Sequence, residues 1–208
     1  DLSNLKGSRN LLDVAWIGDR YIAVGNNGTI LTSNIDGSEW TAQNAGPDLL
    51  TTALNAVATS GDLIVVVGTN GTILTSGDAV TWQTQPKPVN NELNDITWDG
   101  TRFIAVGSND TVLTSADGQA WTSHVAGTSD INFVAVMQWD SGLPADPLLA
   151  AVGSQGTLDV EPTADPGILV RTGTTEQLAG ITFVNDGVES PYVVIVGNDG
   201  TVLTARGE

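Results

Sequence analysis

Two aspartates are the residues of this sequence whose type and spacing best suit catalysis. Asp13 and Asp95 stand at the same position of two copies of an internal repeat, where other copies carry Ala56, Phe133 and Gly180. Two carboxylates that face one channel could act as general acid and general base on a glycosidic bond. Hydrogen bonding to the backbone of a channel wall would explain the same residues without any chemistry. Asp13 and Asp95 are therefore weak catalytic candidates.

A second set of polar residues is expected at one end of the repeats, around the mouth of a central channel. A ring of amides and carboxylates there could bind a sugar or a calcium ion, and a mouth that is only solvated is the alternative. No other cofactor is expected. The candidates for binding at the mouth are Asn10, Asn55, Asn94, Asn132, Asn109, Asp110 and Asp199. Trp139 and Asp140 form a second candidate patch, because an insertion lengthens the repeat there.

Composition argues against several classes of protein. The 208 residues include 24 acidic and 7 basic side chains, a net charge of −17, which would repel nucleic acid and anionic lipid. The chain has no cysteine, so disulfides, thiolate metal sites and thiol nucleophiles are excluded. No apolar run approaches the roughly 20 residues that span a bilayer. The acidity, the lack of cysteine and the many Asn and Thr residues favour an extracytoplasmic location, periplasmic, secreted or on a bacterial cell surface.

The elements that would position these residues belong to a repeat. Its central phrase is Tyr21-Ile-Ala-Val-Gly-Asn-Asn-Gly-Thr-Ile-Leu-Thr-Ser33, which returns four more times in modified form. The anchor glycines of the five copies are Gly25, Gly68, Gly107, Gly153 and Gly197, at spacings of 43, 39, 46 and 44 residues. A period of roughly 40–45 residues is typical of a four-stranded propeller blade.

Each copy is interpreted as a hairpin between the second and third strands of a blade. An apolar run ends at the anchor glycine, a turn that favours positive φ follows, and a β-branched run begins with threonine. The first strands are predicted at Leu11–Trp16, Leu54–Thr59, Leu93–Trp98, Ile131–Val136 and Leu178–Phe183. The fourth strands are predicted to open at Trp40, Trp82 and Trp121. Because no segment keeps a period of 3.6 residues, the fold is predicted to be all-β.

The repeats predict a closed five-bladed β-propeller with four antiparallel strands per blade, as a single domain over residues 1–208. The blades are expected at about 11–50, 51–90, 91–128, 129–174, and 175–208 together with 1–10. The fifth copy ends after its third strand. Residues 2–6 are expected to supply its fourth strand, because closing the ring removes exposed sheet edges. We expect a monomer or a part of a larger chain.

The turns before the fourth strands resemble a known motif. Ser33–Trp40, Ser76–Trp82 and Ser115–Trp121 are similar to the Asp box, the Ser-x-Asp-x-Gly-x-x-Trp hairpin of bacterial neuraminidase repeats. The same motif occurs in sortilin-like and photosystem II assembly-factor-like propellers. The resemblance covers the repeat organisation of essentially the whole chain. Ser115–Trp121 is one residue short of the common form, and Ser76–Trp82 lacks the glycine.

The resemblance implies a propeller of the sialidase-like superfamily and carries little information about activity. It implies that the box aspartates, Asp36, Asp78 and Asp117, lie on the peripheral face and bind turn amides. A sialidase would need converging arginines and a tyrosine nucleophile, and Arg20 and Arg102 instead share a turn position away from the mouth. We therefore predict a noncatalytic binding or scaffold propeller that recognises a protein or a glycan. A carbohydrate-active enzyme, glycoside hydrolase-like, using carboxylates at the channel mouth is the alternative.

Overall fold

A computed structural model describes residues 10–125, 131–139, 148–160, 168–184 and 192–206. In these ranges the chain forms five antiparallel sheets, four of four strands and one of three. The helical elements are 3₁₀ turns of three residues each: η2 (Pro47–Leu49), η3 (Thr69–Gly71), η4 (Ser154–Gly156) and η5 (Asn198–Gly200). The prediction of an all-β chain is confirmed.

Each sheet is built from strands that follow one another in the sequence. The first sheet contains β1 (Leu11–Trp16), β2 (Tyr21–Gly25), β3 (Thr29–Ser33) and β4 (Trp40–Gln43). The second contains β5 (Leu54–Thr59), β6 (Ile64–Gly68), β7 (Ile73–Ser76) and β8 (Gln83–Thr84). The third contains β9 (Leu93–Trp98), β10 (Phe103–Gly107), β11 (Thr111–Ser115) and β12 (Thr122–Val125). The fourth contains β13 (Phe133–Trp139), β14 (Leu148–Gly153), β15 (Thr157–Val160) and β16 (Ile168–Arg171), and the fifth β17 (Leu178–Val184), β18 (Tyr192–Gly197) and β19 (Val202–Arg206).

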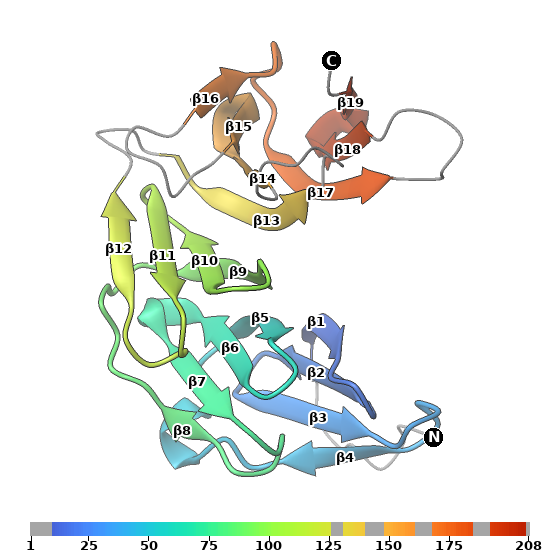
Figure 1. The fold of residues 1–208 in the computed structure, drawn as a ribbon, viewed down its shortest axis with the longest axis vertical. Helices are drawn as coiled ribbons and strands as arrows, with labels where there is room; N and C mark the ends of the chain where they lie inside the picture. The colour runs from blue at the N-terminus through green and yellow to red at the C-terminus, as the bar shows by residue number, and fades with distance from the viewer. Residues whose placement is uncertain (1–9, 126–130, 140–147, 161–167, 185–191, 207–208) are drawn as a thin grey trace.

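The five sheets follow one another in an arc, with the first strand of each sheet on the inner side (Figure 1). Within every sheet the hydrogen-bonded order is the order of the chain. The inner strands pack in sequence, β1 along β5, β5 along β9, β9 along β13 and β13 along β17. The first and fifth sheets lie at the two ends of the arc. Closure of one on the other was not detected, and the predicted closing strand, residues 2–6, lies outside the described residues.

The first strands β1, β5 and β9 have the predicted bounds, and β13 does not. The sequence places the fourth of these strands at 131–136, whereas β13 begins at Phe133. Phe133 pairs with the anchor Gly153 as Leu11 pairs with Gly25. Phe133 is therefore the counterpart of Leu11, and Ala135 rather than Phe133 occupies the position of Asp13. The apolar Ile131 two residues upstream imitates a strand start, and pairing with Gly153 sets the actual register.

The anchor glycine is required because another backbone segment touches it. A Cβ on Gly68 would lie 2.1 Å from the carbonyl oxygen of Ala53, the residue before β5. The same conflict arises at every anchor glycine, with distances between 2.0 and 2.6 Å. Thr69, the residue after Gly68, donates its N–H to that same carbonyl at 3.0 Å. The glycine therefore lets the second strand of a sheet pass against the entry to its first strand.

The turn after the anchor glycine is the predicted type I′ turn. Asn27 and Gly28 both have positive φ, 59° and 62°, and the N–H of Thr29 donates to the carbonyl of Asn26 at 3.2 Å. These turns also connect consecutive sheets. Gly28 donates its N–H to the carbonyl of Thr52, at the entry to the second sheet, at 2.8 Å.

The core consists of four apolar clusters, one at each junction between consecutive sheets. At the first junction Ile22, Val24 and Ile30 of the first sheet pack on Leu54 and Val57 of the second. Alternate residues of one strand face opposite junctions, as the two-residue period of a strand requires. Every interior sheet is therefore buried on both faces, which explains the nearly continuous apolar run of each second strand.

Candidate functional site

Asp13 connects the inner strands of the first two sheets. One carboxylate oxygen, Oδ1, accepts the N–H of its neighbour Val14, and Oδ2 accepts the N–H of Val57 in β5, each at 2.8 Å. The inner edge of the first strand of a sheet has no partner strand. A backbone N–H group on that edge therefore needs another acceptor when it is buried. The carboxylate provides that acceptor for two sheets at once.

Asp95 repeats this arrangement between the third and fourth sheets. Its Oδ1 accepts the N–H of Ile96, and its Oδ2 accepts the N–H of Val136 in β13, again at 2.8 Å each. Val14, Val57, Ile96 and Val136 hold equivalent positions in four consecutive sheets. Two carboxylates therefore satisfy four equivalent backbone amides.

This geometry explains why the aspartate occurs in alternate sheets. A carboxylate has two oxygen atoms, so one aspartate serves its own sheet and the next sheet. The second and fourth sheets need no acid of their own and carry Ala56 and Ala135 at that position. The break in repetition that suggests a catalytic pair is thereby accounted for by backbone hydrogen bonding.

Burial alters the ionisation of both carboxyl groups. Burial away from water raises the pKa of Asp13 above its usual value, and the hydrogen bonds from Val57 and Val14 only partly offset it. For Asp95 burial raises the pKa to about 7, against the hydrogen bonds from Val136 and Ile96, and the negative charge of Asp13 adds to the rise. A group that titrates near neutral pH could exchange protons with a substrate, but both oxygen atoms of Asp95 already accept backbone N–H groups.

Asparagine side chains make further contacts between inner strands. Asn55 donates its Nδ2 amide to the carbonyl of Leu93 in the third sheet at 2.8 Å. Asn94 donates in the same way to the carbonyl of Phe133 in the fourth sheet at 2.6 Å. The neighbouring sheet therefore accepts one N–H of each side-chain amide. Asn55 Nδ2 also donates to Glu92 Oε1 at 3.3 Å, and the side-chain carbonyl of each residue can accept from a further group.

A hollow of about 390 Å³ opens where the first strands begin. It receives side chains from all five sheets or from the loops that enter them. The lining residues are Leu12, Asn55, Glu92, Asn94, Ser108, Asn132, Val134 and Gln177. The lining combines side-chain amides, one hydroxyl and one carboxylate with two apolar side chains and contains no cationic group. We call this hollow the inner mouth.

The structure brings some of the predicted binding residues together and leaves others apart. Asn55, Asn94 and Asn132 line the inner mouth. Asn109 lies beside it, since its N–H donates to Oδ1 of Asn132 at 3.2 Å. Asn10 contributes its backbone carbonyl to the N–H of Asn26.

The remaining predicted residues do not line the inner mouth. Asp199 is exposed in its turn with a φ of 52°. Asp110 is 2% exposed and occupies the turn position that glycine holds in the other four copies. Trp139 ends β13, and Asp140, the other residue of the predicted patch, lies outside the described residues.

Sequence reasoning missed the apolar part of the inner mouth. Leu12 and Val134 hold the same strand position as Asn55 and Asn94 and line the same hollow. The repeat carries that signal, since a residue that shares a position with two mouth asparagines should share their location. A search restricted to polar residues overlooks it.

The turns before the fourth strands hold their aspartates on the periphery. Asp117 Oδ1 accepts the N–H groups of Ala120 and Gln119 at 2.8 and 2.9 Å, and these bonds hold the pKa of Asp117 below its usual value. The turn packs on the preceding sheet, because a Cβ on Gly118 would lie 2.8 Å from a methyl carbon of Leu63. These hydrogen bonds give Asp117 the structural role that the sequence predicts.

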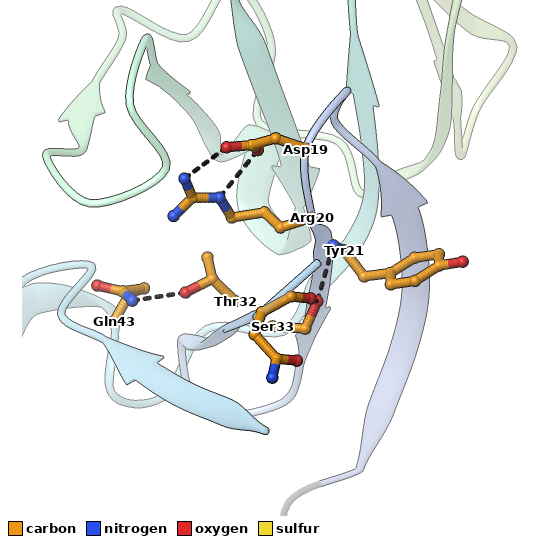
Figure 2. A network of polar contacts seen from close by, with 7 residues as sticks. Asp19, Arg20, Tyr21, Thr32, Ser33 and Gln43 are labelled. Atoms are coloured by element: carbon orange, nitrogen blue, oxygen red, sulfur yellow. Dashed lines mark hydrogen bonds and ion pairs between the residues drawn. The ribbon is translucent and has the colours of Figure 1, made fainter. Parts of the chain in front are cut away.

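The first sheet shows how the shared arginine position is used. Arg20 forms an ion pair with Asp19 at 2.6 Å (Figure 2), and Arg102 pairs with Asp99 at 3.0 Å. In the same view the ring of Tyr21 points away from this network, while its backbone N–H donates to Ser33 Oγ at 2.9 Å. Neither arginine lines the inner mouth.

Two further observations concern the described ranges. No group of three or more His, Asp or Glu side chains gathers there in a way that could hold a metal ion. No helix in the same ranges is long and apolar enough to cross a membrane.

Comparison with known proteins defines the fold. No protein-family model and no curated protein matches the sequence. The structure of YCF48 bound to D1 peptide matches 96% of this chain and 66% of its own, at 18% identity and a TM-score of 0.74. YCF48 from Cyanidioschyzon merolae matches 98% of this chain and 69% of its own, also at 18% identity and 0.74. The WD40 propeller domain of Doa1 matches 97% and 67%, at 14% identity and 0.72.

These similarities, together with the successive four-stranded sheets, define a β-propeller fold. The chain spans about two thirds of the length of the propellers that it matches. At such low identity the similarity establishes the fold and no activity.

Proposed function

We propose that the chain is a noncatalytic, extracytoplasmic propeller module that binds an extended segment of a partner protein at the inner mouth. The observation that carries the proposal is the composition of the mouth. Amide side chains can donate to and accept from a peptide backbone, and Leu12 and Val134 offer apolar contact beside them. The structure of YCF48 bound to D1 peptide supports peptide recognition by a propeller of this kind.

A protein partner is favoured over hydrolysis of a glycan. An enzyme would need Asp13 or Asp95 to reach a substrate, and each carboxylate is occupied by two backbone N–H groups. A glycan that is bound without being hydrolysed would contact the same side-chain amides of the inner mouth. The experiment below distinguishes a glycan from a peptide ligand. We further propose that the peripheral turns are Asp boxes, that the propeller has five blades and that its ring is closed. The location outside the cytoplasm rests on the acidic composition and the absence of cysteine.

The test is selection of random displayed peptides on the purified chain, followed by affinity measurement for the selected sequences. Glu92→Lys reverses the one charge that lines the inner mouth and should reduce the affinity of the selected peptides at least about tenfold. Glu39→Lys is the matched control, because it makes the same change of charge on an exposed peripheral turn.

Two results would contradict the proposal. Selected peptides that bind Glu92→Lys as well as they bind the parent would place their site elsewhere. A rise in melting temperature with neutral oligosaccharides, combined with failure to select any peptide, would favour a glycan ligand.

A further inference from the structure

Among the described residues that line the inner mouth, Glu92 carries the only charge. Its backbone carbonyl accepts the N–H of Ser108 at 2.9 Å, which fixes the residue at the entry to β9. Its side-chain Oε1 accepts the Nδ2 amide of Asn55, from the second sheet, at 3.3 Å. A carboxylate can accept about four hydrogen bonds, so this one long contact leaves most of the acceptor capacity unused. Because Glu92 is exposed, a ligand in the mouth can reach it.

Asn55 presents an acceptor to the same space. Its Nδ2 group has two hydrogens, and both are used, one by Glu92 Oε1 and one by the backbone carbonyl of Leu93 at 2.8 Å. The Oδ1 atom is then the polar group that this side chain offers to a ligand. Asn55 and Glu92 therefore form a part of the mouth that accepts hydrogen bonds and donates none. We call these two side chains the acceptor subsite.

Hydrogen-bond donors remain in the rest of the mouth. Asn94 uses one of its two amide hydrogens, on the carbonyl of Phe133. Asn132 accepts the N–H of Asn109 with its Oδ1 at 3.2 Å, and its own amide group is left to donate. Such amides can pair with the carbonyl groups of a peptide. The acceptor subsite thus lies beside donors of the third and fourth sheets and differs from them in what it can bind.

The distribution of charge favours a cation at the acceptor subsite. No described lysine or arginine lines the inner mouth. Lys87 donates its Nζ to the backbone carbonyl of Asn70 at 3.0 Å, and Arg20 and Arg102 pair with aspartates of their own turns. The chain as a whole has a net charge of −17. An anionic group would therefore meet only acceptors and a negative potential at this subsite.

We propose that the acceptor subsite binds a lysine or arginine side chain of the partner segment, so that the inner mouth selects basic peptides. This inference rests on the proposed peptide binding and adds the chemistry of the partner. An ammonium group has three donors, a guanidinium group has five, and neither has an acceptor, which matches a subsite without donors. Hydrogen bonds between charged groups are also shorter and stronger than those between neutral groups.

Apolar contacts lie on both sides of the acceptor subsite. Leu12 of the first sheet and Val134 of the fourth sheet hold the same strand position as Asn55 and Asn94 and line the same hollow. Lysine and arginine have apolar stems that pack on such surfaces while their charged ends stay hydrated. We therefore expect the preferred segment to carry apolar residues beside its basic residue.

The test is selection of displayed peptides in parallel on the parent, on Glu92→Gln and on Glu39→Gln. Peptides selected on the parent and on Glu39→Gln should carry lysine or arginine at one fixed position, and this enrichment should be absent on Glu92→Gln. Glu92→Gln keeps the size of the side chain and removes its charge. Glu39 is exposed on a peripheral turn, so its variant controls for the general attraction of basic peptides to an acidic chain.

A double-mutant cycle on one selected peptide then assigns the contact. Replacing the basic residue of the peptide by glutamine should weaken binding to the parent at least about fivefold. The same replacement should weaken binding to Glu92→Gln less than about twofold, because the carboxylate is already gone. A peptide with glutamate at that position should bind Glu92→Lys more tightly than it binds the parent. Added salt should weaken the parental complex more than the complex with Glu92→Gln.

The outcomes separate this inference from the proposed function. Leu12→Ser removes an apolar contact of the mouth without changing its charge and so reports binding there independently of Glu92. Peptides that lose affinity for Leu12→Ser but show no preference for a basic residue would overturn the cationic subsite and leave peptide binding in place. Equal losses in the two backgrounds of the cycle would do the same. Failure to select any peptide would overturn both proposals.

Spermidine tests whether a free amine is the source of the cation. It carries ammonium groups without a peptide backbone, so it should bind the parent at least about tenfold more weakly than a selected peptide does. Spermidine that binds the parent as tightly as the peptides, and binds Glu92→Gln more weakly, would overturn a peptide as the source.

Discussion

Asp95 shows how a residue that resembles a catalytic acid can be explained by backbone geometry. A free inner edge presents one amide per sheet that needs an acceptor, and one carboxylate between two sheets serves both. The sequence shows the alternation of Asp13 and Asp95 but not its cause. The cause is the hydrogen bonding of one carboxylate to two consecutive sheets, and no local sequence pattern shows which sheets are neighbours.

The raised pKa of Asp95 predicts a pH dependence of stability. The carboxyl group has a pKa of about 7 in the folded chain and 3.8 as its ordinary value, so the folded state binds the proton more tightly. Stability should therefore fall as the pH rises from about 4 to about 7 and level off above that. Asp95→Asn should flatten this decline. A pKa that rises from 3.8 to about 7 corresponds to a loss of up to roughly 4 kcal/mol, or about 8–16 °C in melting temperature.

Thermal melts at closely spaced pH values check this prediction, with Asp62→Asn as a control on an exposed turn. Asp36, Asp78 and Asp117 have lowered pKa values, so they contribute stability that is lost only at lower pH. An identical decline in the parent and in Asp95→Asn would show that other groups cause it.

At the scale of strands and turns the repeat determines most of the structure. The anchor glycine, the type I′ turn and the two-residue period predict the second and third strands because these signals are local. The fourth strands are less regular, since β8 contains only two residues. The sequence places the start of β13 two residues too early, because Ile131 continues the apolar pattern upstream of Phe133.

The close approach at Gly68 predicts a large cost for a single methyl group. Gly68→Ala would place a Cβ 2.1 Å from the carbonyl oxygen of Ala53, and we expect destabilisation of about 1–3 kcal/mol as the backbone shifts. Gly77→Ala is the matched control, because its Cβ would lie 3.8 Å from the carbonyl oxygen of Asp62. Chemical denaturation measures both, and equal midpoints would contradict the close contact.

The peripheral turn of the third sheet gives a separate prediction. Asp117→Ala removes the acceptor for two turn amides and for Ser115 Oγ, so it should lower stability by about 1 kcal/mol. Affinity for peptides selected at the inner mouth should be unchanged. Lost affinity together with unchanged melting would show that this turn belongs to the binding site.

For the whole molecule, the sequence predicts the order of the sheets, and the structure adds the curvature with which they follow one another. Leu12 and Val134 line the inner mouth because curvature brings all five first strands together, and hydropathy within one repeat does not report that curvature. The apolar residues of β1 read as ordinary core in the sequence. Leu11 and Val14 are nevertheless 44% and 57% exposed, and the sequence pattern of the strand does not report this exposure.

The completion of the fifth sheet is the last prediction. Residues 2–6 are expected to pair with β19 as its fourth strand, because an unpaired strand edge is otherwise left exposed. Deleting residues 1–8 should therefore lower the melting temperature by several degrees, since about 1 kcal/mol corresponds to roughly 2–4 °C in a chain of this size. Leu5→Pro should reproduce part of that loss, because proline removes a backbone donor, whereas Leu5→Ile should not. Melts at the lowest workable concentration separate this effect from association between copies. A truncated chain that melts with the parent would show that the fifth sheet is stable with three strands, and its outer edge would then be open to another chain.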